Sequence, residues 1–154
     1  MIHANDHVNA SESTYDTYPT AVKLATYFGI QDLLAALAVL RGAFQVKAED
    51  FKNILKIGRT QLQDAVPMTL GQEFAAFASM IAADEKRLRE SASLLCEINM
   101  GGTAIGTGIN APVGYADVVT AKLAEFSGVP VVKAEDMIAA TADTGVFADI
   151  SGIL

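Results

Sequence analysis

The chain has 154 residues, of which 51% are hydrophobic and 7% are aromatic. This length suffices for one domain with a core, and the 26 alanines favour a helical bundle over a β-sandwich because alanine is the strongest helix former. A net charge of −7 argues against nucleic acid or an anionic membrane surface as a partner. The single cysteine excludes an intrachain disulfide and fits a reducing compartment.

The sequence shows neither a membrane span nor a secretory signal. Its longest apolar run, Leu33 to Leu40, is far shorter than the roughly 20 residues needed to cross a bilayer. The first residues, MIHANDHVN, have no basic segment followed by an apolar one. We therefore expect a cytoplasmic protein that does not contact a membrane.

A long helix is predicted over about residues 17–56. Asp16 or Thr17 can cap it, and Pro19 falls in its first turn, where the missing N–H costs nothing. Apolar residues then recur at helical spacing as far as Leu55.

Residues 58–70 (GRTQLQDAVPMTL) interrupt the helical pattern. Pro67 and the mixed polarity predict an extended, irregular excursion there. A second long helix is predicted over about 71–99, and the four glycines of 101–110 (GGTAIGTGIN) predict a loop. Shorter elements follow: a helix over about 115–127, a short strand at Val131 and Val132, and helical segments over 134–142 and from 146 onward.

These elements predict an all-α, long-helix bundle with short extended excursions. We expect a single partial domain over 1–154, because the last helical segment reaches Leu154 without a stop signal and the first residues are loop-like. Long alanine-rich helices leave apolar stripes that a chain of this size cannot cover, so we expect self-association.

Two polar segments are candidate binding sites. Ser13 and Thr14 precede a helix start, where unpaired N–H groups favour anions; the plainer alternative is that they only cap the helix. Arg59, Thr60 and Gln61 offer a cation, a hydroxyl and an amide in a predicted loop. The alternative there is a structural turn with Arg59 in a salt bridge.

Other motifs are excluded by their context. The glycines of 101–110 do not form a nucleotide fingerprint, although Asn110 and neighbouring threonines could donate hydrogen bonds. His3 and His7 have a spacing that suits a metal only on a helix, and this segment does not look helical, so we expect no metal site. Cys96 is expected inside a helix and in the core. No cofactor motif is present.

Four segments, HANDHVN, SESTYDTYPTA, KIGRTQLQDAVPMTLGQEF and GGTAIGTGIN, stand in this order along the chain. Together they resemble the aspartase/fumarase superfamily, and the similarity continues through residues 130–154. The resemblance implies part of the central helical domain of an all-helical homotetramer, whose active sites combine loops from three subunits. It also implies elimination of ammonia or water from a dicarboxylate to give fumarate, without a cofactor.

The same resemblance implies roles for particular residues. Ser13 and Thr14 would bind a substrate carboxylate, Thr60 and Gln61 would line the pocket, and Asn110 would belong to the same pocket. A second dicarboxylate site known from fumarases corresponds to His3, Asn5 and Asp6.

The choice between ammonia and water as leaving group depends on few residues. Gln61 is the residue that the resemblance implies for an aspartate ammonia-lyase, because fumarases typically carry histidine at that position. His3 in HANDH instead favours a fumarase. We expect conversion of L-aspartate to fumarate and ammonia, with fumarate hydratase as the alternative.

Three departures from the family pattern bear on activity. Glu12 and Tyr15 replace the glutamine and asparagine of SQSTND, and a carboxylate near a dianion's pocket is repulsive. The GSSxMPxKxNP loop, which supplies the serine base and a lysine, does not occur in the chain, so no catalytic base is assigned and the isolated chain is expected to be inactive. A further alternative is a truncated homologue that acts only as a helical oligomeric or ligand-binding module.

Overall fold

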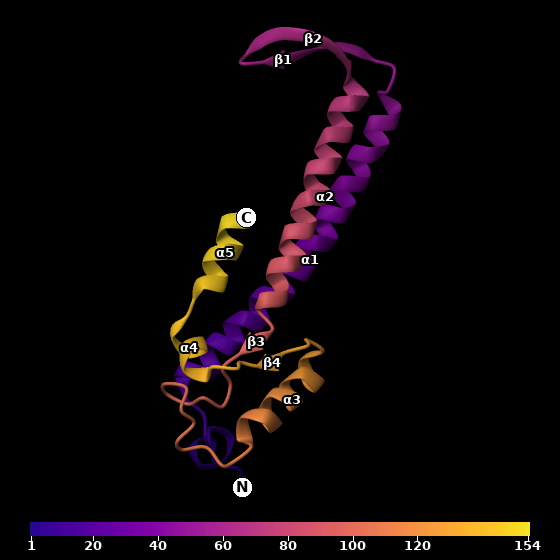
Figure 1. Cartoon of the computed structure of the whole chain (residues 1–154). Coiled ribbons are helices and arrows are strands. Elements are labelled where there is room, and N and C mark those ends of the chain that lie inside the picture. Colours follow the sequence, from indigo (N-terminus) through magenta and orange to yellow (C-terminus); the bar gives the residue numbers. More distant parts are fainter. The chain divides into compact units, whose positions relative to one another are not determined.

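The computed structural model describes every residue from Met1 to Leu154 and is mainly helical (Figure 1). The elements in chain order are η1 (Ala4–Val8), α1 (Thr14–Asp50), β1 (Leu55–Thr60), β2 (Gln63–Thr69), α2 (Leu70–Leu94), β3 (Glu97–Ile98), α3 (Tyr115–Ser127), β4 (Val132–Lys133), α4 (Met137–Ala142) and α5 (Gly145–Ile153). The expected all-α class with short extended excursions is confirmed. The chain divides into two compact units, a loop unit (1–29 with 90–154) and a hairpin unit (30–89).

Helix α1 begins at Thr14 because Ser13 caps it. The Ser13 carbonyl accepts a 2.9 Å hydrogen bond from the N–H of Thr17, and its hydroxyl accepts one of 3.2 Å from the N–H of Tyr15. The expectation that Asp16 or Thr17 would cap the helix is therefore wrong, and the side chain of Asp16 is fully buried instead.

Pro19 consequently lies inside α1 and not in its capping turn. Proline has no N–H to offer the carbonyl four residues earlier, which is that of Tyr15. The side-chain Nδ2 of Asn99 donates to this carbonyl at 3.0 Å, so it replaces the missing helix hydrogen bond. The helix then runs unbroken through Gly29.

The end of α1 is fixed by a close approach to the start of α2. The N–H of Gly71 donates to the Phe51 carbonyl at 3.0 Å. A Cβ atom at Gly71 would lie 2.5 Å from the Ala48 carbonyl oxygen, so only glycine permits this contact. For this reason α1 ends at Asp50 and not near the predicted residue 56.

Residues 55–69 form a β-hairpin, where the sequence predicted an irregular excursion. β1 and β2 pair antiparallel from Leu55 opposite Thr69 to Thr60 opposite Gln63, with one irregularity beside Gly58. A two-stranded sheet has only edge strands, so the proline at position 67 is tolerated there.

Helix α2 begins with a reciprocal capping box. The N–H of Thr69 donates to Gln72 Oε1 at 2.9 Å, and the N–H of Gln72 donates to Thr69 Oγ1 at 3.1 Å. The helix ends at Leu94, short of the predicted residue 99, because residues 97–98 form β3.

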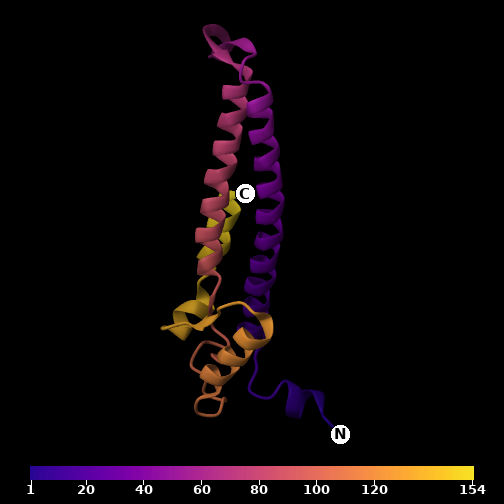
Figure 2. The same ribbon diagram turned by 90° about the vertical axis from the view of Figure 1, so that its right-hand side faces the viewer.

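Within the hairpin unit, α1 and α2 run side by side in opposite directions (Figure 2). Four phenylalanine rings pack between them with centroids 5.4–6.0 Å apart: Phe44, Phe51, Phe74 and Phe77. Glu85, only 3% exposed, accepts from Arg41 Nε at 2.8 Å and from Arg89 Nη2 at 3.3 Å. The hydrogen bond from Arg41 holds the pKa of the Glu85 carboxyl below its ordinary value, and Arg89 adds to this effect.

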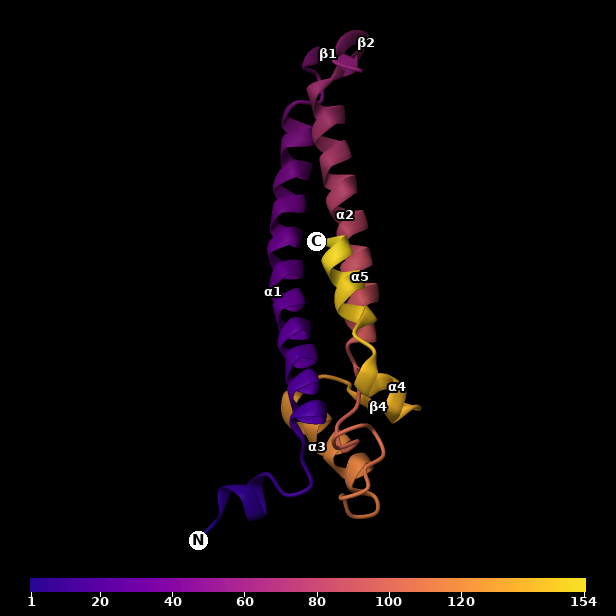
Figure 3. The same ribbon diagram turned by 90° about the vertical axis from the view of Figure 1, so that its left-hand side faces the viewer.

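The core of the loop unit surrounds the parallel pair β3 and β4, and Figure 3 shows β4 beside α3. Its buried residues are Cys96, Ile98, Val129 and Val131. Cys96 lies in this core as expected, but in the turn after α2 and not in a helix, and burial raises the pKa of its thiol. The helix predicted over 115–127 is present as α3.

By length and composition alone, α1 is a candidate membrane span. One 18-residue window has a mean hydropathy of 1.4 and only 17% of it is buried. This helix escaped the search for long apolar runs because single charged residues interrupt it, as Asp32 does before Leu33. The core helix of a soluble protein passes the same test.

Candidate functional site

The first turn of α1 presents hydrogen-bond donors at a cavity in the loop unit. Ser13 lines this cavity, while Thr14 is exposed beside it. The N–H groups of Ser13, Tyr15, Asp16 and Thr17 are all occupied by acceptors within the protein. The N–H of Thr14 thus remains for a ligand, together with the hydroxyl hydrogen of Ser13. The capping role considered for this segment is therefore present, and Ser13 also lines a cavity.

The glycine loop 101–110 forms the opposite wall. The cavity has a volume of about 650 Å³, with residues 11–13 on one side and residues of the loop, among them Thr103, Thr107 and Asn110, on the other. The structure therefore brings together Ser13 and Asn110, two predicted site residues that are distant in sequence. No lysine, arginine or histidine lines the cavity.

A buried carboxylate joins these two walls. Asp16 is 0% exposed, and its Oδ1 accepts from the N–H of Ser13 at 2.9 Å. Its Oδ2 accepts from the N–H groups of Gly101 at 3.1 Å and Thr103 at 2.9 Å. Gly101 has a φ of +90°, and a Cβ atom there would lie 2.7 Å from Ala116, so glycine is required for this loop geometry.

The two substituted positions of the SESTYD segment differ in their surroundings. Glu12 lines the cavity, and its carboxylate accepts from Thr17 Oγ1 at 2.9 Å. Tyr15 is 67% exposed and does not line the cavity. Burial raises the pKa of Tyr115, and the nearby carboxylates of Asp16 and Glu12 raise it further.

Thr60 and Gln61 lie at the tip of the hairpin, in the other compact unit. Gln61 and Leu62 form its two-residue turn, with φ values of 50° and 63°. Residues other than glycine rarely adopt such left-handed conformations. Where they do, the position is usually a tight turn or a functional site. Leu62 is fully exposed, and Arg59 pairs with Asp64 across the hairpin, so the salt bridge considered for Arg59 is present.

His3, Asn5 and Asp6 belong to a short, fully exposed segment around η1. The N–H of Asp6 donates to His3 Nδ1 at 3.2 Å, and the N–H of His3 donates to His7 Nδ1 at 2.7 Å. His3 and His7 are thus engaged with backbone groups. The structure contains no cluster of three or more histidine, cysteine, aspartate or glutamate side chains that could hold a metal ion.

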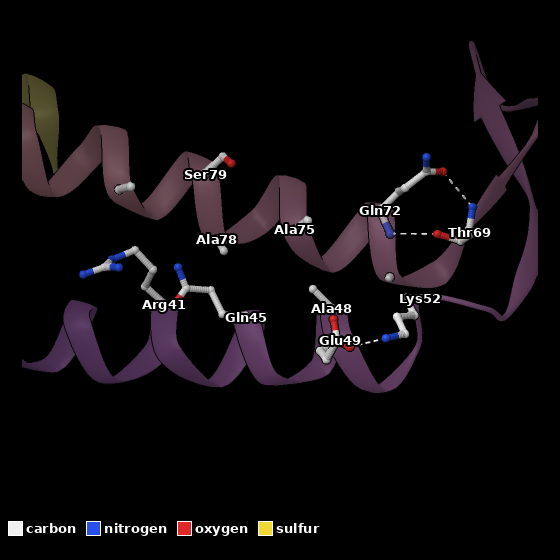
Figure 4. Close-up of a pocket in the computed structure, with 12 residues that line it drawn as sticks. Arg41, Gln45, Ala48, Glu49, Lys52, Thr69, Gln72, Ala75, Ala78 and Ser79 are labelled. Atoms are coloured by element: carbon white, nitrogen blue, oxygen red, sulfur yellow. Dashed lines mark hydrogen bonds and ion pairs between the residues drawn. The ribbon is translucent and has the colours of Figure 1, made fainter.

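A separate groove of about 620 Å³ lies between α1 and α2 in the hairpin unit (Figure 4). Alanines form much of its floor, and Arg41, Gln45, Lys52 and Gln72 lie along it. It contains none of the predicted site residues. For this reason we do not regard it as the substrate pocket.

Comparison with known proteins decides the family. Residues 1–154 match the protein family described as Lyase over their whole length. The chain belongs to this lyase family. This confirms the resemblance seen in the four sequence segments.

Two curated relatives of this lyase chain are aspartate ammonia-lyases. The protein from Escherichia coli strain K12 is 50% identical over 153 residues, which cover 99% of the chain and 32% of that protein. The protein from Pseudomonas canavaninivorans is 53% identical over 154 residues, which cover 99% of the chain and 32% of that protein. The chain thus spans about a third of the length of these relatives.

Solved structures agree in fold with the lyase chain. Fumarate lyase:delta crystallin from Brucella melitensis bound to cobalt superposes with a TM-score of 0.96 at 50% identity, covering 99% of the chain and 33% of that protein. Class II fumarase from Schistosoma mansoni gives a TM-score of 0.88 at 31% identity, covering 99% and 35%.

Sequence reasoning missed the roles of Asp16 and Asn99 in this lyase chain. Asp16 was expected at a helix cap, and Asn99 was expected within a helix. One signal was available for Asn99: a proline inside a helix leaves a carbonyl that needs another donor.

Proposed function

We propose that this chain supplies part of the active site of an aspartate ammonia-lyase, which converts L-aspartate to fumarate and ammonia. The observation that carries this proposal is the cavity between Ser13 and Asn110, in a chain 50–53% identical to aspartate ammonia-lyases. In this reaction a base removes a proton from Cβ, the electron pair forms the Cα–Cβ double bond, and the C–N bond breaks so that the ammonium group leaves as ammonia.

In this proposal the cavity binds one substrate carboxylate. The Ser13 hydroxyl, the Thr14 N–H and the Asn110 side chain donate hydrogen bonds to it. Donors placed at a carboxylate stabilise the extra negative charge that develops when the Cβ proton leaves. Thr60 and Gln61 contribute to substrate binding from the hairpin tip of another subunit of the proposed tetramer, and His3, Asn5 and Asp6 form a second dicarboxylate site.

The isolated 154-residue chain does not catalyse the reaction, according to this proposal. The sequence contains no GSSxMPxKxNP segment, and no basic side chain lines the cavity. The donors of Ser13, Thr14 and Asn110 can hold a carboxylate, but removal of a carbon-bound proton requires a positioned base, which the family pattern supplies from the absent segment.

The proposed protein is a homotetramer in which other subunits cover the long helices. Exposed large apolar side chains on these helices support this: Val39, Val46 and Met80 are each at least 60% exposed. Large apolar side chains exposed along helices in this way are characteristic of subunit interfaces.

The test uses a chimera in which this chain replaces the 153 matched residues of Escherichia coli aspartate ammonia-lyase. We expect Ser13→Ala and Asn110→Ala each to raise KM for L-aspartate, by about tenfold for the loss of a hydrogen bond to a charged group. Asn53→Ala, at an exposed position between α1 and β1, is the control and should change nothing. An unchanged KM in both site variants would refute the assignment of the cavity.

A further inference from the structure

We propose that Asp16 is a positioning residue: its buried carboxylate fixes the spacing between the Ser13 turn and the glycine loop, so that donors on both walls reach one substrate carboxylate. This inference rests on the proposed function for its catalytic consequence. Its geometric part depends only on the structure of the chain.

The two carboxylate oxygens of Asp16 accept hydrogen bonds from different segments of the chain. Oδ1 accepts from the N–H of Ser13 at 2.9 Å, and Thr17 Oγ1, whose shorter contact is to Glu12 at 2.9 Å, lies 3.2 Å away. Oδ2 accepts from the N–H groups of Gly101 and Thr103, at 3.1 and 2.9 Å. One side chain therefore holds each wall of the cavity with a separate oxygen.

No cation pairs with this buried carboxylate. Asp16 is 0% exposed, and its hydrogen-bond donors are the backbone N–H groups of Ser13, Gly101 and Thr103. A buried charge is tolerated only when its hydrogen bonds are made, so the carboxylate strongly disfavours any movement that separates it from either wall.

The loop groups that Asp16 holds have positive φ angles, which is uncommon for the threonine. Gly101 has a φ of +90° and Thr103 a φ of 58°, although Thr103 is a β-branched residue and is only 6% exposed. Such a conformation persists only where its surroundings enforce it. The hydrogen bond from the N–H of Thr103 to Asp16 supplies that constraint.

The consequence for the cavity follows from chain connectivity. Thr103 begins the stretch that leads through Thr107 to Asn110, and all three line the cavity opposite Ser13. If Oδ2 loses its partners, the loop can relax away from α1. The donors would then no longer converge, and substrate binding would weaken even in a folded protein.

The first experiment is amide hydrogen exchange, followed by mass spectrometry, on the chimera with Escherichia coli aspartate ammonia-lyase. Asparagine at position 16 has one acceptor oxygen and directs an NH₂ group at backbone donors. In Asp16→Asn we expect the amides of Gly101 and Thr103 to exchange about tenfold faster or more. Unchanged protection of both amides would overturn the proposal.

The matched control is Lys23→Met. Lys23 is also a buried charged residue of α1 in the loop unit, but its Nζ donates to the Glu97 carbonyl at 2.7 Å. It is not among the residues that line the cavity. We expect Lys23→Met to leave the exchange of the Gly101 and Thr103 amides unchanged relative to the rest of the loop unit.

The second experiment measures steady-state kinetics in the chimera with Escherichia coli aspartate ammonia-lyase. We expect Asp16→Asn to raise KM for L-aspartate about tenfold or more, whereas Lys23→Met leaves KM unchanged. A fall in kcat alone in Asp16→Asn would mean only that fewer molecules are folded, and would overturn the positioning role.

Asp16→Glu serves as a second variant if Asp16→Asn does not fold, because it keeps the charge and lengthens the side chain by one methylene. It should also raise KM more than it lowers kcat, and an unchanged KM would count against the proposal. If the unsubstituted chimera forms no fumarate, the proposed function fails, and the exchange experiment alone decides whether Asp16 holds the loop.

Discussion

The side-chain Nδ2 of Asn99 donates a 3.0 Å hydrogen bond to the backbone carbonyl of Tyr15, the carbonyl that Pro19 leaves without a helical donor. Asn99 is 0% exposed, and the same Nδ2 donates to Thr141 Oγ1 at 3.0 Å. One amide thus ties the first turn of α1 to α4, on a segment that also presents Ser13 to the cavity.

Removing this amide should destabilise the chain because a carbonyl loses its donor. We expect Asn99→Ala to lower the free energy of unfolding by about 1–3 kcal/mol, the cost of leaving a buried polar group unpaired. Pro19→Ala restores a backbone N–H that can reach Tyr15. In that background, urea unfolding should show a smaller cost for Asn99→Ala, by about 1 kcal/mol. Equal costs in the two backgrounds would show that Asn99 does not substitute for the helix bond.

Acid should weaken the hairpin unit through Glu85. Hydrogen bonding from Arg41 lowers the pKa of this carboxyl from its ordinary value of 4.5. Because the folded pKa is the lower one, the stabilisation is complete above pH 4.5 and is lost as pH falls through the folded pKa. Below pH 4.5, the free energy of unfolding measured with urea should depend less steeply on pH in Glu85→Gln than in the unsubstituted chain. Glu49→Gln, at an exposed position, is the control; an unaltered slope in Glu85→Gln would contradict the prediction.

The hairpin turn should become more stable when its strain is relieved. Leu62 has a φ of 63°, which glycine adopts without the steric cost that other residues bear. We expect Leu62→Gly to raise the free energy of unfolding of the hairpin unit by about 0.5–1 kcal/mol. Leu55→Gly, in a strand, should lower it. A loss of stability in Leu62→Gly would mean that the left-handed turn is absent in solution.

Glu12 should weaken substrate binding by charge repulsion. Its carboxylate lines the proposed carboxylate-binding cavity. In the chimera, Glu12→Gln should lower KM for L-aspartate by about threefold or more. It should also lower the pKa of Tyr115, which the Glu12 charge raises, and an NMR titration of that ring can follow this change. A higher KM in Glu12→Gln would indicate that Glu12 binds the substrate's ammonium group.

The sequence was most informative where backbone requirements are local. The helix over 115–127 could be delimited because Gly128, which has a φ of 70°, and Pro130 follow it. The glycine loop was identified because four glycines disfavour a helix, and the SESTYD segment because two hydroxyls precede a predicted helix start. Glycine adopts a positive φ at little cost, so its positions mark such turns in the sequence.

Tertiary contacts decided the rest. Ser13 and Asp16 are both good helix caps, and only the burial of Asp16 against Gly101 and Thr103 decides between them. The hairpin was missed because Pro67 argues against a strand inside a larger sheet. In a two-stranded sheet both strands are edge strands, and a proline is tolerated there. The convergence of Ser13 and Asn110 depends on a buried carboxylate whose partners lie far away in sequence.

The most direct test of the central claim is the rate of fumarate formation by the chimera, followed by ultraviolet absorbance, with L-aspartate and with L-malate as substrates. Our account predicts fumarate from L-aspartate, little or none from L-malate, and none from the isolated 154-residue chain with either substrate. Fumarate from L-malate but not from L-aspartate would contradict the account and support a fumarate hydratase instead.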